Sequence, residues 1–152
     1  MLKVVVDYPS RDEERMIINR VTSDPQIHLN PVVDVETILH ARKLVQQIYV
    51  DDKVKEYVLD LIGATRHPAT IALPELAELI SYGASPRASI YLINAARANA
   101  FINGRGYVIP DDIKELASDV LRHRIIVSYE AESQEVTSSE IIQKILDHIE
   151  VP

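Results

Sequence analysis

The residues best placed for chemistry in this chain are six consecutive ones: Gly83, Ala84, Ser85, Pro86, Arg87 and Ala88. Ser85 suits the N-cap of a helix, where its hydroxyl can accept a hydrogen bond from a backbone N–H, and Pro86 suits the first helical position. Arg87 then lies in the first turn, where the helix dipole disfavours a cation. A helix N-terminus with an arginine beside it can bind an anion. The same pattern also fits a solvated arginine, and the sequence leaves both interpretations open.

Other residues that could do chemistry have simpler interpretations. Asp111 and Asp112 could form a catalytic pair of carboxylates, but both stand at a predicted helix start, where acids act as caps. Asp119 and His123 are four residues apart and could share a metal ion. We expect instead that His123 contacts the last carbonyl groups of its helix, and we predict no metal site. Arg66 could reach a bound anion or stabilise its own helix end, and we leave it out of the candidate site.

The segment 83–88 resembles the sensor-2 motif of the MoxR family of AAA+ ATPases. Residues 107–113 (Tyr-Val-Ile-Pro-Asp-Asp-Ile) and 120–125 (Val-Leu-Arg-His-Arg-Ile) are similar to the lid of that family. Residues 6–10 (Val-Asp-Tyr-Pro-Ser) resemble the end of the last strand of its ATPase core. Nearly the whole chain can be laid on the C-terminal part of such a protein. The resemblance therefore implies that residues 1–9 are the end of the core and a linker, and that residues 10–152 are a helical lid domain.

The resemblance also implies a function for the segment 83–88. The intact protein would bind ATP and Mg²⁺ between its core and its lid, and would act as a ring, usually a hexamer. Hydrolysis would drive remodelling or maturation of partner proteins, often ones with von Willebrand factor A domains. Arg87 would reach the β- and γ-phosphates and act in catalysis. The residues on the nucleotide would be Gly83, Ala84, Ser85, Pro86 and Arg87.

The chain lacks the sequence motifs that ATP hydrolysis requires. It contains no Gly-x-x-x-x-Gly-Lys-Ser/Thr phosphate loop and only four glycines, and no apolar strand ends in Asp-Glu. We therefore expect the chain alone to bind no ATP or Mg²⁺ and to be inactive. Two other classes of function stay open: a free-standing helical protein-interaction module, and a helical DNA-binding module.

Composition narrows these classes. The 152 residues are 47% hydrophobic, which predicts one folded domain with a short lead-in. The net charge of −7, with no dense basic run, argues against nucleic acid as a partner. The chain has no cysteine, so it forms no disulfide. We find no apolar run near 18 residues, and expect a cytoplasmic protein that does not insert into a membrane.

The hydrophobic spacing predicts an all-α bundle. We expect helices over residues 10–21, 34–48, 51–63, 86–103, 111–122 and 137–149, and between the third and fourth of them an excursion in which residues 75–80 form about two helical turns. Two of them begin with a capping box, Ser10 with Glu13 and Thr137 with Glu140. Residues 2–6 read as a short strand left from the ATPase core, and residues 124–129 as a β-like segment that could pair with a short partner.

The spacing also predicts which residues face the core. In the first helix Met16 and Ile17 should point inward. The alanine-rich helix 86–103 should pack closely against its neighbours and end at Gly104. The apolar stripes of the other helices comprise Val54, Tyr57, Val58, Leu61, Ile62, Ile113, Leu116, Ala117, Val120, Leu121, Ile141, Ile142, Ile145, Leu146 and Ile149.

Overall fold

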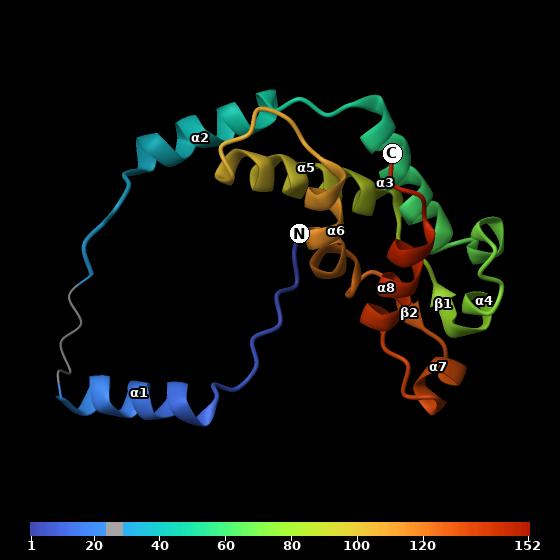
Figure 1. Cartoon of the computed structure of the whole chain (residues 1–152), viewed down its shortest axis with the longest axis horizontal. Coiled ribbons are helices and arrows are strands. Elements are labelled where there is room, and N and C mark those ends of the chain that lie inside the picture. The colour runs from blue at the N-terminus through green and yellow to red at the C-terminus, as the bar shows by residue number, and fades with distance from the viewer. Residues whose placement is uncertain (24–28) are drawn as a thin grey trace.

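The computed structural model of the chain describes residues 1–23 and 29–152 and confirms the predicted all-α class (Figure 1). Helices make up most of it, and two short strands form a small sheet. The elements in chain order are α1 (Arg11–Ser23), α2 (Val35–Gln47), α3 (Asp52–Ala64), the 3₁₀ helix η1 (Pro68–Ile71), α4 (Leu76–Leu79), β1 (Ile80–Tyr82), α5 (Pro86–Ile102), α6 (Pro110–Leu121), β2 (Ile126–Val127), α7 (Tyr129–Ser133) and α8 (Ser138–His148).

Four of the predicted helix starts, those of α1, α2, α3 and α8, are capped by the predicted side chains. Glu13 accepts a hydrogen bond from the backbone N–H of Ser10 at 2.8 Å, which closes the capping box of α1. The box of α8 is complete as well: Glu140 accepts from the backbone N–H of Thr137 at 2.7 Å, and the Thr137 hydroxyl accepts from that of Glu140 at 3.2 Å. These bonds satisfy N–H groups that have no partner within the helix. Side-chain caps also begin α2 and α3, at Asp34 and Asp51.

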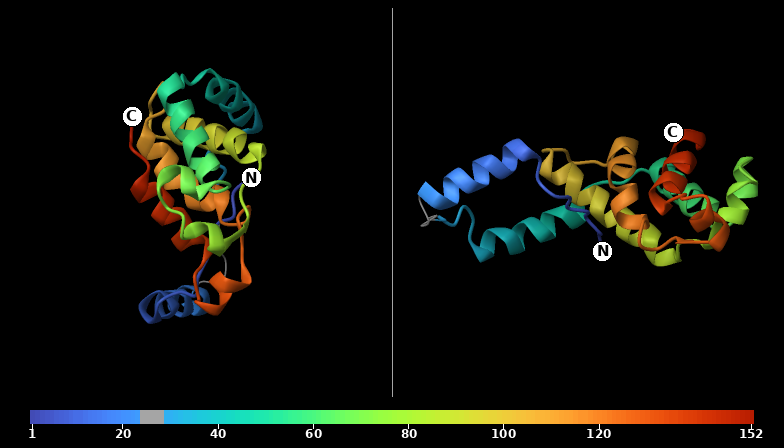
Figure 2. Two further views of the ribbon diagram at one scale, coloured as in Figure 1. Left: turned by 90° about the vertical axis from the view of Figure 1, so that its right-hand side faces the viewer. Right: turned by 90° about the horizontal axis from the view of Figure 1, so that it is seen from below.

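Helix α5 lies at the centre of the bundle, with α2, α3 and α6 packed around it (Figures 1 and 2). Small side chains on α5 let these neighbours approach closely, since Ala95, Ala96 and Ala100 are all buried. On the far side of α6, helix α8 contributes the buried stripe that its spacing predicts. All predicted core residues of α3, α6 and α8 are buried except Leu116, which is partly buried against the core.

Residues 1–9 form no strand within this chain, because a β-strand needs a neighbour to pair with and the segment makes only isolated contacts, such as a 2.8 Å bond from Lys3 N to the Asp119 carbonyl. That residues 2–6 end the last strand of an ATPase core stays a prediction. One prediction for the N-terminal region is wrong. Helix α1 is formed but buries no residue, so Met16 and Ile17 are exposed rather than inward. Figure 1 shows α1 set apart from the bundle.

The predicted β-like segment is confirmed. Strand β2 pairs with β1 in an antiparallel two-stranded sheet, with Ile80 opposite Val127. A second backbone link joins the loops after α2 and α5, where Tyr49 N donates to the Gly106 carbonyl at 3.0 Å and Val108 N donates to the Tyr49 carbonyl at 2.9 Å. None of the helices that the structure describes is long and apolar enough to cross a membrane.

A buried carboxylate joins α5 to α6. Asp112 is 2% exposed. Its Oδ2 accepts from the Ile109 backbone N–H at 2.9 Å and from Arg105 Nη1 at 2.8 Å, and its Oδ1 accepts from Asn99 Nδ2 at 3.0 Å. The predicted capping role is therefore confirmed for Asp112, although α6 begins one residue earlier than expected, at Pro110. The ion pair with Arg105 was not predicted, because its partners are seven residues apart and on different elements.

The end of α6 is capped by arginines rather than by the predicted histidine. Arg122 Nε donates to the Ser118 carbonyl at 3.1 Å, and Arg124 Nε donates to the Val120 carbonyl at 2.9 Å. His123 lies between them and is exposed. A guanidinium on a longer side chain can turn back to the last carbonyl groups, and its permanent charge suits the negative end of the helix dipole.

Replacing Asp112 with alanine should destabilise the domain by about 2–4 kcal/mol, because it leaves the partly buried Arg105 guanidinium and the Ile109 N–H without their acceptor. The matched control is Asp111→Ala, which removes the neighbouring carboxylate from an exposed site in the same turn and should cost no more than about 0.5 kcal/mol. Urea unfolding of both variants measures the difference. Equal losses of unfolding free energy in the two variants would show that the buried network around Asp112 contributes little to stability.

The same network predicts a dependence on pH. Burial raises the pKa of the Asp112 carboxyl, but bonds from Arg105, Ile109 and Asn99 outweigh it and hold the pKa below its ordinary value of 3.8. A pKa lowered by folding adds stability above the unfolded-state pKa, and this stability is lost as the pH falls through the folded-state value. The free energy of unfolding should therefore drop below about pH 4, and less steeply in Asp112→Asn. If the free energy of unfolding fell equally with pH in the wild type and in Asp112→Asn, this prediction would be contradicted.

Candidate functional site

The candidate site lies where β1 passes into α5. Ser85 has the backbone conformation of an N-cap, with φ −74° and ψ 165°, and Pro86 takes the first helical position as predicted. The predicted side-chain cap is wrong, however, because the Ser85 hydroxyl makes no capping bond. The N–H of Ala88 is already bonded to the Ser85 backbone carbonyl, at 2.8 Å. The first turn of α5 is thus left without a side-chain cap.

Arg87 faces solvent from this turn. Ser85, Pro86 and Arg87 are all exposed, whereas the flanking Ala84 and Ala88 are fully buried. Across residues 1–23 and 29–152, no carboxylate forms an ion pair with Arg87. Its positive charge adds to that of the helix dipole, and no ion pair in the described chain offsets it. The local field therefore favours an anion at this end of α5.

Two residues at the end of α3 hold the segment in place. The Thr65 hydroxyl, which is buried, donates to the Ile62 carbonyl at 2.7 Å and accepts from the Ala84 backbone N–H at 2.9 Å. Arg66 Nε donates to the Ala84 carbonyl at 2.7 Å. Sequence reasoning missed Thr65 and left Arg66 undecided, because these bonds join residues 18 and 19 positions apart and no local pattern signals them.

Gly83 is fitted against the same helix end. A Cβ atom at this position would collide with the backbone carbonyl group of Thr65 and would lie 2.9 Å from Arg66 Cγ. Gly83 was predicted as a nucleotide-binding residue, and the structure shows a packing reason for the glycine. Backbone contact of this kind leaves no room for adjustment.

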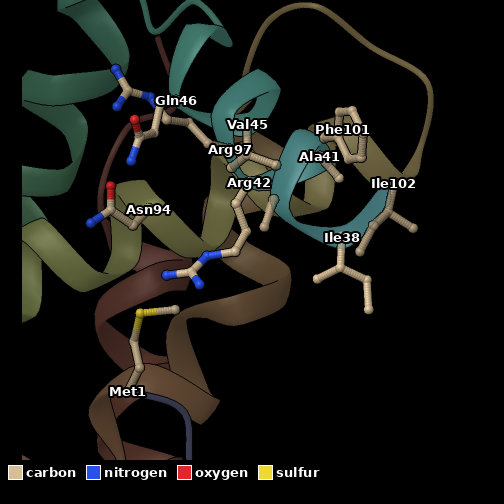
Figure 3. A pocket seen from close by; sticks show the side chains of 11 residues that line it. Met1, Ile38, Ala41, Arg42, Val45, Gln46, Asn94, Arg97, Phe101 and Ile102 are labelled. Atoms are coloured by element: carbon tan, nitrogen blue, oxygen red, sulfur yellow. The ribbon is translucent and has the colours of Figure 1, made fainter. Parts of the chain in front are cut away.

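No group of three or more His, Asp or Glu side chains within the described ranges could hold a metal ion. A separate hollow of about 490 Å³ lies between α2 and α5 (Figure 3). Its lining is mostly apolar, and Arg42 and Arg97 add positive charge to it. The Nε of Arg97 is buried and has no hydrogen-bond partner among the described residues.

Comparison with known proteins identifies the fold. Residues 75–145 match the AAA lid domain family, and this range includes α5, α6 and the segment 83–88. The chain is 34% identical over its full length to chaperone MoxR1 of Mycobacterium tuberculosis, and 34% identical to the uncharacterized protein YeaC of Bacillus subtilis. A crystal structure from Cytophaga hutchinsonii, described as a candidate ATPase, superposes on the whole chain with a TM-score of 0.91 at 36% identity.

The fold is therefore that of an AAA lid domain. More narrowly, the chain as a whole is similar to MoxR-type AAA+ proteins and matches their lid-bearing C-terminal part. It spans 40% and 45% of the length of the two curated relatives, and 46% of the solved chain.

Gly83→Ala should destabilise the domain by about 1–3 kcal/mol, because the added methyl group must push apart the α3 and α5 ends. The matched control is Gly63→Ala, where a Cβ meets nothing within 4 Å and where alanine should add about 0.5–1 kcal/mol in a helix. Thermal unfolding followed by circular dichroism would report opposite shifts in Tm. An unchanged Tm in Gly83→Ala would show that the loop is free to move away from α3.

Proposed function

We propose that this chain is the sensor-2 lid of a MoxR-like ATPase, in which ATP binding and hydrolysis drive remodelling or maturation of partner proteins. The observation that carries the proposal is the position of Arg87: exposed, without an ion pair in the described chain, and on the uncapped first turn of α5. A cation at this position is unfavourable by itself and becomes favourable when an anion binds.

The chemistry of the site suits a nucleotide phosphate. A guanidinium can form two parallel, charge-assisted hydrogen bonds to phosphate oxygens, and it stays charged throughout the reaction. Arg87 would contact the β- and γ-phosphates, and the backbone from Gly83 to Pro86 would line the same face of the ligand. Positive charge near the transferred phosphoryl group stabilises the transition state. ATP with Mg²⁺ would be held mainly by an ATPase core, and the lid would supply Arg87.

The exposed N-terminal region supports contact with such a core. Helix α1 presents Met16, Ile17, Ile18 and Val21 to solvent, each at least half exposed, and residues 1–6 are apolar apart from Lys3 and lack a strand partner within the described chain. Apolar surface of this kind is normally covered by protein. We propose that residues 1–9 and α1 pack on the ATPase core, and that the lid also meets neighbouring subunits of a cytoplasmic, usually hexameric, ring. Clients with von Willebrand factor A domains are part of the same proposal.

A protein-interaction module is the second candidate function. The hollow between α2 and α5 favours it, because apolar side chains there lie beside Arg42 and Arg97 (Figure 3). Such a surface suits an apolar protein segment that carries an acidic side chain, which could pair with these two arginines. The two candidate functions can be distinguished through Arg87. A sensor-2 lid requires this side chain, whereas a protein-interaction module does not use it.

In an ATPase that carries this lid behind its core, Arg87→Ala should weaken nucleotide binding or turnover by about 10-fold to 150-fold, which corresponds to the loss of about 1.5–3 kcal/mol from a charged hydrogen bond. The stability of the lid should change by less than about 0.5 kcal/mol, because the side chain is exposed. Steady-state ATP hydrolysis, nucleotide titration and urea unfolding measure the three quantities.

The control is Lys53→Ala. Lys53 is an exposed cation at the same helical position of α3, but there the side chain of Asp51 already caps the turn. The Lys53→Ala variant should leave ATP binding and hydrolysis unchanged. Wild-type activity in Arg87→Ala would refute the sensor role and leave Arg87 as a solvated side chain.

A further inference from the structure

We propose that Thr65 and Arg66, at the end of α3, are positioning residues that hold Arg87 at the place where it meets the nucleotide phosphates. This inference rests on the sensor role proposed above. Under this inference α3 does more than pack against α5, because its C-terminal end determines the position of the first turn of α5.

The Thr65 hydroxyl is the first of two polar ties. Thr65 is 1% exposed, so its hydroxyl has no water to bond and must find partners in the protein. It donates to the Ile62 carbonyl of its own helix and accepts from the Ala84 N–H. Both roles are used, and the acceptor role ties the backbone two residues before Pro86 to the last turn of α3.

Arg66 supplies the second tie. Its Nε bonds the carbonyl of Ala84, the residue whose N–H is bonded to Thr65, so both polar backbone groups of Ala84 are held from α3. The close packing of Gly83 against the Thr65 carbonyl blocks movement toward α3. Three contacts in different directions thus fix the backbone just ahead of Ser85, Pro86 and Arg87.

This arrangement explains how an exposed arginine can have a defined position. Arg87 has no side-chain partner of its own among the described residues, so its location depends on the backbone that carries it. A charge that must meet a reacting phosphate loses much of its effect when it is displaced by about 1 Å. Because Ala84 is tied to α3, Arg87 moves with α3 and α5 as one unit when the lid changes its angle.

The test uses an ATPase that carries this lid and compares three threonine variants. Thr65→Val keeps the shape but removes the hydroxyl, and should lower kcat/KM for ATP about 10-fold or more. Thr65→Ser keeps the hydroxyl and should stay within about 2-fold of wild type by the same reasoning. The control is Thr70→Val, which removes an exposed hydroxyl whose bond, to the His67 carbonyl, is purely local. It should leave kcat/KM unchanged.

Coupling to Arg87 distinguishes a positioning role from general loosening of the fold. If Thr65 acts through Arg87, then Thr65→Val combined with Arg87→Ala should be no worse than Arg87→Ala alone. Multiplied losses in the double variant, or wild-type activity in Thr65→Val, would overturn the inference while leaving the sensor role intact. Wild-type activity in Arg87→Ala would instead overturn the sensor role, and the inference with it.

Arg66→Ala keeps the proposal testable if Thr65→Val does not fold. Arg66 is exposed, so its removal breaks the Nε bond to Ala84 without opening the core. We expect the same loss of kcat/KM and the same lack of additivity with Arg87→Ala, with the Tm of the domain unchanged. Additive losses from Arg66→Ala and Arg87→Ala would contradict a positioning role for Arg66.

Discussion

The fold depends on the buried carboxylate of Asp112. A charge at this depth is tolerated only when every acceptor position is used, and Asp112 meets that condition through Arg105, Asn99 and the N–H of Ile109. These partners come from α5, from the loop after it and from the start of α6. One side chain therefore sets the distance between the two central helices, the path of the loop between them and the start of α6.

The two ends of α5 are held in different ways, and the difference bears on function. At the C-terminal end, charged and amide groups converge on Asp112, and Gly104 with φ +70° turns the chain away from the helix. At the N-terminal end, Thr65 and Arg66 hold backbone groups of Ala84 and leave the side chains of the first turn exposed. The first arrangement stabilises the bundle, whereas the second leaves Arg87 exposed on a helix start that is held in place.

Local patterns predicted the local parts of the structure well. The capping boxes at Ser10 and Thr137 formed because both partners are three residues apart, and the apolar stripes of α3 and α8 are buried because helical spacing places them on one face. The same reasoning failed for α1, whose apolar stripe is exposed. An apolar face shows that a helix needs a partner, but it does not show where that partner is.

For the candidate site, the sequence by itself determined that a helix starts at Pro86 and places Arg87 in its first turn, since proline acts through the backbone of its own segment. Only the tertiary structure decided that the Ser85 hydroxyl makes no cap, that Gly83 is needed for contact with Thr65, and that Ala84 is tied to α3. The tertiary structure alone also decided the ion pair between Arg105 and Asp112. These interactions join residues distant in sequence or on different elements, so they exist only once the helices have packed.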